Sequence, residues 1–347
     1  MFFGEKYIPK KGFLFSPFQD RGVFYSMKIL LISSGYRGIY PYFEQAIEEA
    51  FMFFDHTITK INPVYTQETI EKIKDFTPDL IITLVGYKVD KQLIDYFKKS
   101  GSILSIWLTE DPFYIDSSIE VVKDYDYIFT IDLGAFEFYK KKFPERNFFH
   151  LPLGTDPILY QPSSTPIKFL YDLCLVGYPY PERIELVNHI LNHTQYSLIL
   201  GGPRWRKYIA NSNNVERLTI VNKWVVPEVV RNIFISSKII LNPHRTYNFD
   251  KNINTLGIES KSINNRTFDI AACGGFQLIP KKPDLGMHFN VSNEIVFYTN
   301  NDNCIELINH FMNNEKARNQ YSKNAKERVL NSHTFFHRIQ FILEKIL

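Results

Sequence analysis

Several features that mark common protein classes are missing from this chain of 347 residues. No run approaches the roughly 18 apolar residues that a membrane-spanning helix needs, and the N-terminus lacks the apolar core of a signal peptide. Three cysteines, an odd number, lie in segments that we expect to be buried: Cys174, Cys273 and Cys304. They predict free thiols in a reducing compartment, without a disulfide framework. Together these absences predict a soluble, cytoplasmic protein.

Signatures of nucleotide and metal binding are missing as well. The chain has no Gly-x-x-x-x-Gly-Lys-Ser/Thr loop and no Gly-x-Gly-x-x-Gly after its first expected strand, which argues against an ATPase and a dinucleotide-dependent enzyme. No Asp-x-Asp pair stands where a metal-bound diphosphate would need it, and the His and Cys spacings of metal sites are absent. We therefore expect no metal and no cofactor.

Apolar and aromatic residues are abundant, at 45% and 16% of the chain, which is enough for sizeable cores. The net charge of +3 gives no case for general nucleic-acid binding. The charges are uneven, with 18 Lys/Arg against 22 Asp/Glu in residues 1–165 and 22 against 15 in residues 166–347. A basic second half would suit a nucleoside diphosphate, although an uneven solvated surface explains it nearly as well.

Continuous apolar segments alternate with amphipathic ones, which predicts parallel sheets covered by helices on both faces. The first half contains strand patterns at 28–34, 57–61, 79–85, 102–108, 127–131 and 148–151. The second half contains strand patterns at 172–176, 196–200, 218–221, 238–241, 276–279 and 295–298, followed by closing helices at 302–313, 315–331 and 333–346. Right-handed crossovers make each series a doubly wound α/β domain.

The segment between the two series, 152–166, is rich in proline and polar residues, which predicts a linker between domains. We expect an N-terminal extension (1–26), a first domain (27–160), a second domain (161–330) and a closing helix (331–347) that packs back across both. Ligands of such sheets bind outside the carboxyl ends of the strands, so the residues that follow strands are the candidates for a site.

The segment from 264 to 280 has the most informative pattern. A short helix begins after Asn265-Arg266, and Gly274 and the glycine after it end the helix before a buried strand. Helix-start amides and Arg266 favour a phosphate, and Asp269 is placed to accept hydrogen bonds from sugar hydroxyls. On the pattern alone, a structural helix–glycine–strand joint is the more frequent explanation.

Three residues after the first strand suggest a close backbone approach to an acceptor substrate, although a plain turn is equally consistent: Gly35, Tyr36 and Arg37. Glu110 and Asp111 follow the fourth strand, and Asp111 is the candidate base for the proton of an acceptor hydroxyl, with helix capping as the alternative. Asp132, which follows the fifth strand, is expected to cap the next helix.

In the second domain Gly177 follows a strand, and Arg183 falls in the first helical turn, where it can face a phosphate or lie on the surface. His244 and Arg245 follow the strand at 238–241. His244 is placed to bond a sugar hydroxyl or a phosphate, unless it is a loop histidine without a role. Trp205 is more often packed in such a position than stacked on a nucleobase.

The order of residues in these segments resembles the CgeB-type (spore maturation protein) glycosyltransferases, relatives of the two-domain nucleotide-sugar transferases called GT-B. Their donor-site motif reads Arg-x-Phe-Glu-x-x-Ala-Cys-Gly-x-x-x-Leu, and the matching residues here are Arg266, Phe268, Ala272, Cys273, Gly274 and Leu278. Asp269 stands where the family usually has Glu. Further similarity lies at Trp107–Pro112, Leu151–Pro157, Val176–Arg183, Asn242–Arg245 and His333–Arg338, so that the resemblance covers about 28–345.

The resemblance implies a GT-B fold, with two Rossmann-like domains, a cleft between them, an N-terminal acceptor domain and a C-terminal donor domain. It implies metal-independent transfer of a sugar from a UDP- or GDP-sugar to a glycan, protein or small-molecule acceptor. Asp269 would bind the donor ribose, Arg183 and Arg266 the diphosphate, and Asn265 and His244 the sugar or a phosphate. The remaining implied donor-binding residues are Gly177, Arg245, Gly274 and Gly275.

Related transferases carry a second acid eight residues before the ribose-binding one, and this chain has Lys261 there. The alternative is therefore a non-catalytic, lectin-like protein that binds nucleotide sugars or glycans with the same architecture. A sugar-nucleotide epimerase or hydrolase is a third possibility. The sequence predicts no nucleic-acid partner and does not fix the oligomeric state.

Overall fold

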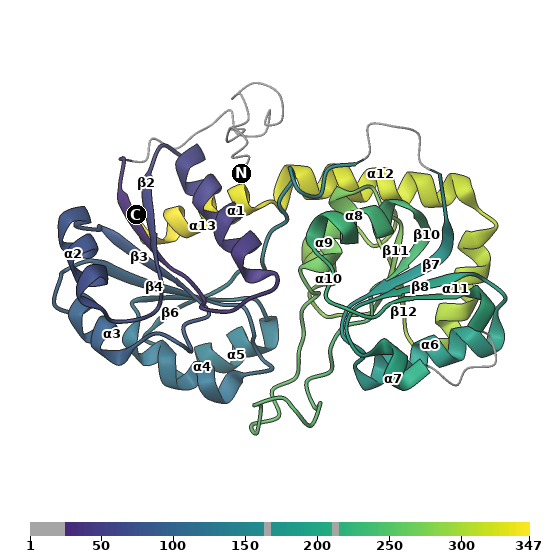
Figure 1. The fold of residues 1–347 in the computed structure, drawn as a ribbon, viewed down its shortest axis with the longest axis horizontal. Coiled ribbons are helices and arrows are strands. Elements are labelled where there is room, and N and C mark those ends of the chain that lie inside the picture. The colour runs from purple at the N-terminus through teal and green to yellow at the C-terminus, as the bar shows by residue number, and fades with distance from the viewer. Residues whose placement is uncertain (1–24, 163–167, 210–214) are drawn as a thin grey trace.

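The computed structural model describes residues 25–162, 168–209 and 215–347. The predicted extension lies, up to residue 24, outside the described residues. Two lobes lie side by side (Figure 1), and each is built around one parallel sheet of six strands. We call them the first lobe, around the sheet of the N-terminal half, and the second lobe.

The sheet of the first lobe has the order β2-β1-β3-β4-β5-β6. Its strands are β1 (Lys28–Ile32), β2 (Thr57–Ile61), β3 (Leu80–Leu84), β4 (Ile103–Leu108), β5 (Tyr127–Thr130) and β6 (Asn147–His150). Its helices are α1 (Tyr40–Phe53), α2 (Gln67–Phe76), α3 (Lys91–Phe97), α4 (Ile115–Val121) and α5 (Leu133–Lys142), with a 3₁₀ turn η2 (Val122–Asp124). All six predicted strands are present, with ends within two residues of those expected.

The sheet of the second lobe has the order β12-β11-β10-β7-β8-β9. Its strands are β7 (Tyr171–Val176), β8 (Leu198–Gly201), β9 (Leu218–Val221), β10 (Ser237–Leu241), β11 (Gln277–Pro280) and β12 (Val296–Tyr298). Its helices are α6 (Pro181–His193), α7 (Trp205–Ile209), α8 (Pro227–Ile235), α9 (Arg266–Ala272), α10 (Leu285–His288), α11 (Asn301–Met312) and α12 (Glu315–Ser332), with a 3₁₀ turn η3 (Val215–Arg217). The short helices α7 and α10 were not predicted.

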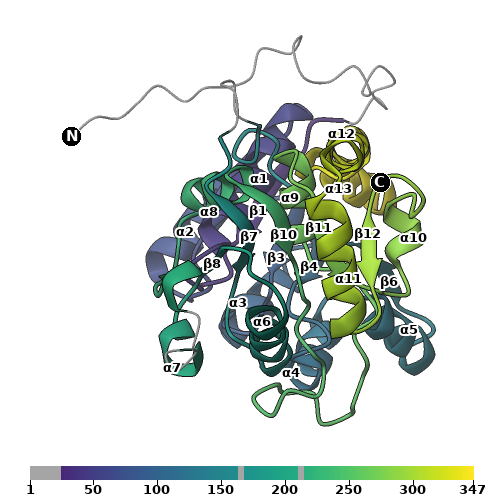
Figure 2. The ribbon, with the colours of Figure 1, turned by 90° about the vertical axis from the view of Figure 1, so that its right-hand side faces the viewer.

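Both faces of each sheet are buried, because successive side chains along a strand point to opposite faces and both sets are apolar here. In β7, Leu173 and Leu175 pack with α6 and α11, whereas Cys174 and Val176 pack with α8, α9 and α12. Figure 2 shows α6 and α11 on the same side of this sheet. The continuous apolar strands are thus explained by helices on both sides.

The last helix, α13 (Phe335–Ile346), leaves the second lobe and packs against α1 of the first lobe (Figure 1). Its apolar side chains join the core under β1, β3 and β4. Arg338 Nε donates to the carbonyl oxygen of Pro152 at 2.6 Å, and Thr155 pairs with Thr334, so α13 also holds the linker. The predicted GT-B arrangement of two doubly wound sheets and a returning helix is therefore confirmed.

Each strand order contains one switch point, where the connections that leave two neighbouring strands run to opposite faces of the sheet. It falls between β1 and β3 in the first sheet and between β7 and β10 in the second. Loops that leave the carboxyl ends there diverge and make room for a ligand. The segments after β7 and β10 contain Gly177 and His244, so the second switch point coincides with the predicted donor side.

Candidate functional site

Two cationic side chains converge at the switch point of the second sheet. Gly177, directly after β7, lies so close to two arginines that a Cβ atom there would be 2.3 Å from Arg183 Nη1 and 3.5 Å from Arg266 Nη2. Arg183 comes from the first turn of α6 and Arg266 from the start of α9. Glycine is required here because any side chain would occupy the guanidinium position. Three predicted donor-binding residues are thus brought together.

The two arginines differ in how their charges are satisfied. Arg183 is 4% exposed, and it donates through Nε to the carbonyl oxygen of Pro243 and through Nη1 to that of Tyr178, both at 3.0 Å. Burial and the nearby Arg266 charge lower the pKa of Arg183 to about 9. The side chain of Arg266 is partly exposed and makes no hydrogen bond or ion pair with another described residue, although the Asp269 carboxylate attracts it from the same helix; its guanidinium is therefore available to an anion.

His244 lies in the same cluster and is also without a partner. It is 8% exposed, and neither ring nitrogen has a hydrogen-bond partner among the described residues. Burial, followed by the charges of Lys282, Arg183 and Arg266, holds the pKa of His244 well below its usual range. Lys282 follows β11 and was not predicted as a site residue; its nearness to His244 is visible only once β11 is placed beside β10. Its Nζ donates to the carbonyl oxygen of Ser260 at 2.6 Å.

Asp269 lies in α9 on the side of the linker. Its Oδ1 accepts a hydrogen bond from Thr155 Oγ1 at 2.8 Å, and its Oδ2 accepts one from Asn265 Nδ2 at 3.4 Å. The residue is 5% exposed, and burial raises the pKa of Asp269 to about 7. The structure thus joins Asp269 and Asn265 to the linker beside Arg266, with the Thr155 hydroxyl on one oxygen of the Asp269 carboxylate.

The two glycines that end α9 do not lie at this site, which corrects their predicted donor-binding role. Gly274 takes a φ of 76°, as expected at a helix end, and a Cβ on Gly275 would be 2.4 Å from Ile240 Cδ1. Both precede β11 and therefore lie at the amino ends of the strands, opposite the ligand edge. Their sequence signal is explained by helix termination and close packing on β10.

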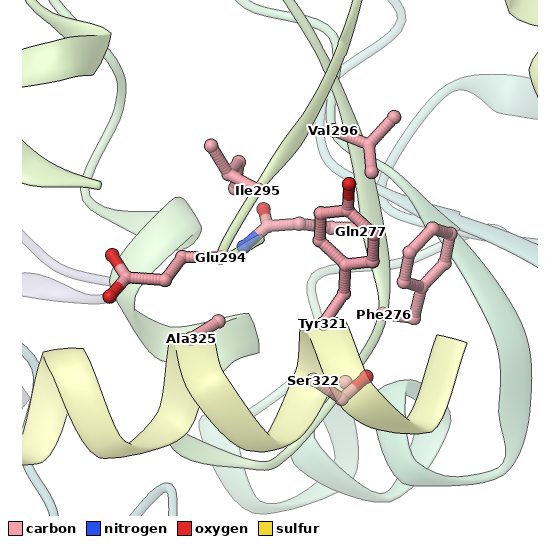
Figure 3. A pocket seen from close by; sticks show the side chains of 9 residues that line it. Phe276, Gln277, Glu294, Ile295, Val296, Tyr321, Ser322 and Ala325 are labelled. Atoms are coloured by element: carbon pink, nitrogen blue, oxygen red, sulfur yellow. The ribbon is translucent and has the colours of Figure 1, made fainter. Parts of the chain in front are cut away.

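A small hollow beside these glycines is shown in Figure 3. It is lined by residues of β11, β12 and α12 and of the segments that precede the two strands, among them Phe276, Gln277, Val296 and Tyr321. Its volume of about 10 Å³ admits no more than about one water molecule. It is therefore a packing gap, and no substrate is assigned to it.

Arg245 connects the second lobe to the first. Its guanidinium carbon lies 4.5 Å from the ring centre of Phe113 and 5.2 Å from that of Tyr180, between residues of the two lobes. Its Nη1 is 3.9 Å from Glu110 Oε2, and its Nη2 donates to Asn252. The predicted donor residue Arg245 thus lies where the carboxyl ends of both sheets meet.

Of the two acids after β4, the structure turns Glu110 toward this meeting point and Asp111 away from it. Asp111 is 1% exposed, and its carboxylate accepts hydrogen bonds from Ser118 (2.5 Å), Thr130 (2.8 Å) and Tyr139 (3.1 Å). Burial raises the pKa of Asp111 to about 7. Enclosed by three hydroxyls of its own lobe, Asp111 cannot reach an acceptor, which corrects its assignment as the base.

Glu110 has the environment that was expected of its neighbour. Its side chain is 30% exposed, it accepts a hydrogen bond from Tyr40 of α1, and Arg245 approaches it from the second lobe. Burial raises the pKa of Glu110 above its usual value. The sequence contained the signal, two adjacent acids at a strand end, but did not say which of them faces the site.

The predicted acceptor segment lies nearby at the rim of the first lobe. Gly35 takes a φ of 69°, and Lys88 Nζ donates to its carbonyl oxygen at 2.9 Å. The ammonium of Lys88 also lies 3.7 Å from the ring centre of Tyr36, and Arg37 is exposed. Trp224 of the second lobe approaches this segment, since a Cβ on Gly38 would be 3.5 Å from its Nε1.

The loop between β10 and α9 is fastened to the first lobe by Asp132. This carboxylate caps α5, as predicted, by accepting from the amides of Gly134 and Ala135. It also accepts from Ser260 Oγ at 2.9 Å and from the backbone amide of Lys261 at 3.1 Å. Lys261 Nζ pairs with Glu137 at 2.6 Å, so the residue that replaces the second acid of related transferases joins the two lobes instead.

Among the described residues, no group of three or more His, Cys, Asp or Glu side chains is arranged to hold a metal ion. All three cysteines are buried and unpaired, as predicted. None of the helices in the described part of the chain is both long and apolar enough to span a membrane.

Known proteins resemble this chain in sequence and in fold. A family model described as glycosyl transferase-like matches residues 183–344. The spore protein CgeB of Bacillus subtilis (strain 168) is 35% identical over 307 residues, which cover 87% of this chain and 94% of that protein. The sucrose-phosphate synthase (tll1590) from Thermosynechococcus elongatus has a similar fold, with a TM-score of 0.69, 12% identity and coverage of 92% of this chain and 99% of that one. Anabaena Alr3699/HepE, solved with UDP and glucose, gives a TM-score of 0.64 at 11% identity, with coverage of 92% and 99%.

Proposed function

Because this chain belongs to the CgeB-type glycosyltransferase family, we propose that it transfers a sugar from a nucleoside-diphosphate sugar to a glycan, protein or small-molecule acceptor. The similarly folded Anabaena protein was solved with UDP, so UDP-sugars are the first donors to test. The second lobe would hold the donor and the first lobe the acceptor.

One observation carries this proposal: a cluster of cations at the switch point of the second sheet, whose charge the nearby Asp269 offsets only in part. Arg183 and Arg266 lie together around Gly177, and Lys282 and the unpartnered His244 face the same place. Bringing like charges together costs free energy that a bound anion can offset, and a diphosphate supplies negative charge of the right kind. Arginine is suited to this task because its planar donors match two phosphate oxygens at once.

The same cations would assist the reaction itself. The bond between the anomeric carbon and the diphosphate oxygen breaks, its electron pair leaves with the diphosphate, and the charge that develops there is stabilised by preformed donors. We propose that Arg183, Arg266 and Lys282 perform this task without a metal ion.

On the acceptor side, we propose Glu110 in place of Asp111. The acceptor hydroxyl oxygen forms the new bond to the anomeric carbon, and Glu110 is the carboxylate placed to take its proton. Its partners Tyr40 and Arg245 come from α1 and from the second lobe, so the carboxylate is oriented between the two predicted substrates.

The test is a thermal-shift screen of the full chain against UDP-, GDP-, TDP- and CMP-sugars, followed by an assay for the released nucleotide (a nucleoside diphosphate, or CMP from a CMP-sugar) with and without EDTA. A shift with one nucleotide, and release that depends on an added acceptor and resists EDTA, is expected. Binding without release would favour the non-catalytic alternative, and release without acceptor would indicate a hydrolase. The absence of any shift would remove the donor site.

A further inference from the structure

His244 is fixed in position by its neighbours but has no partner of its own. On one side the carbonyl oxygen of Pro243 accepts from Arg183, and the Asn242 side chain is bonded to Asn264, Thr267 and Gln277. On the other side Arg245 is bonded to Asn252. The imidazole between them is 8% exposed, and both of its nitrogens are buried without a hydrogen bond in the described part of the chain.

Buried polar atoms without partners are rare in folded proteins, because each costs free energy. A rigid histidine with two unused nitrogens therefore points to a ligand that satisfies them. The charged groups that act on this imidazole come from three elements packed around it, and all are cations: Arg183 of α6, Arg266 of α9 and Lys282 after β11. Burial and these charges keep the ring neutral in the free protein, since they lower its pKa.

We propose that His244 takes up a proton when the diphosphate of the donor binds, so that donor binding is coupled to proton uptake from solvent. This inference rests on the proposed function. A diphosphate beside Arg183, Arg266 and Lys282 cancels the positive field that disfavours the imidazolium. Its oxygens also accept hydrogen bonds from the N–H groups of the protonated ring. In this way the same ligand satisfies the unused nitrogens and the excess positive charge.

The coupling has a definite sign. The pKa of His244 is low in the free protein and higher in the complex, so binding takes up a proton in the pH window between the two values. The added affinity is fully present below the free pKa and is lost as pH rises through the bound pKa. Within the window, the affinity for a nucleoside diphosphate falls up to about tenfold for each unit of pH.

The experiment is calorimetric titration of the full chain with UDP at pH 7, in buffers that differ in ionisation enthalpy. The dependence of the measured enthalpy on the buffer gives the number of protons exchanged. We expect His244 to take up as much as one proton. The terminal phosphate of UDP works in the opposite direction, because its second pKa is about 6 and at pH 7 it still holds about a tenth of a proton that it can release on binding. His244→Gln should abolish the uptake, whereas His310→Gln on the exposed face of α11 should leave it unchanged.

The possible outcomes separate this inference from the proposed function. Binding of UDP without proton uptake, or an unchanged uptake in His244→Gln, would overturn the coupling and leave the donor site standing. If UDP, GDP and TDP all fail to bind the wild-type protein, the proposed function fails and the coupling with it. Should His244→Gln not fold, the pH dependence of wild-type affinity decides: a constant dissociation constant between pH 6 and 8 would refute the coupling.

Discussion

Replacing Arg266 with methionine tests the donor site most directly, because this guanidinium has no other bonding partner in the described residues. Methionine keeps an apolar stem of similar length and removes the charge. In the free protein the substitution also relieves the repulsion of Arg183, whose pKa is lowered by Arg266. The substitution also removes the attraction of the buried Asp269 carboxylate, which works in the opposite direction. The expected result is weaker binding of UDP by a protein that still folds.

The size of the effect follows from the bonds that would be lost. A hydrogen bond to a charged group contributes about 1.5–3 kcal/mol. Its loss therefore raises the dissociation constant roughly 10- to 150-fold. At a UDP concentration 100 times the wild-type constant, the ligand stabilises the wild type by about 2.7 kcal/mol. At the same concentration the variant would gain only about 0.3–1.4 kcal/mol, a difference that urea unfolding with and without UDP resolves.

Arg328→Met is the matched control. Arg328 pairs with Glu294 at 3.0 Å on the exposed side of α12, so its loss should leave the stabilisation by UDP at the wild-type value. If Arg266→Met is stabilised by UDP as strongly as the wild type and this control, the diphosphate does not bind at Arg266. If Arg266→Met instead unfolds at much lower urea without ligand, the arginine has a structural role.

Further predictions concern the acids and one glycine. Glu110→Gln should lower the transfer rate by about 10²- to 10⁴-fold with unchanged UDP affinity, measured by nucleotide release and calorimetry. The pKa of Asp111 is raised to about 7, so the folded state keeps a proton that the unfolded state releases. As pH rises from about 4 to 7, the free energy of unfolding of the wild type should therefore fall relative to that of Asp111→Asn, which urea unfolding measures. Asp132→Ala removes a helix cap and the bonds to the 260–262 loop, and should lower the free energy of unfolding by roughly 2–4 kcal/mol. Gly275→Ala should cost about 1–3 kcal/mol in the same assay with unchanged UDP affinity, because its Cβ would meet Ile240.

The strands could be predicted because their physical cause is local. A segment such as Leu80–Leu84 is apolar at nearly every position, which identifies a strand buried on both faces without knowledge of its neighbours. The returning helix was equally visible, since the apolar positions of Phe335–Ile346 require a surface to cover them. The short helices α7 and α10 had no such periodicity to reveal them.

The orientation of single side chains depends on contacts that are distant in sequence. Glu110 and Asp111 are adjacent and chemically alike, and only the hydroxyls of Ser118, Thr130 and Tyr139 draw Asp111 inward. For Gly274 and Gly275 the sequence showed glycines beside a site motif, but a glycine that ends a helix and one that admits a ligand look the same. Their place at the amino ends of the strands, away from the site, follows only from the direction of β11.

The cationic cluster lowers the stability of the free protein, and packing contacts do not offset this loss. Arg183 and Arg266 repel each other, and the two nitrogens of His244 forgo hydrogen bonds that are each worth about 1–3 kcal/mol when a buried group is left unsatisfied. The nearby carboxylate of Asp269 is bonded to Thr155 and so offsets this charge only in part. A chain selected for stability alone would replace these residues with apolar ones at little cost. Their retention at the point where both sheets direct their carboxyl ends is explained by a bound anion, and the arrangement of two arginines, a lysine and a histidine suits a diphosphate better than a single carboxylate.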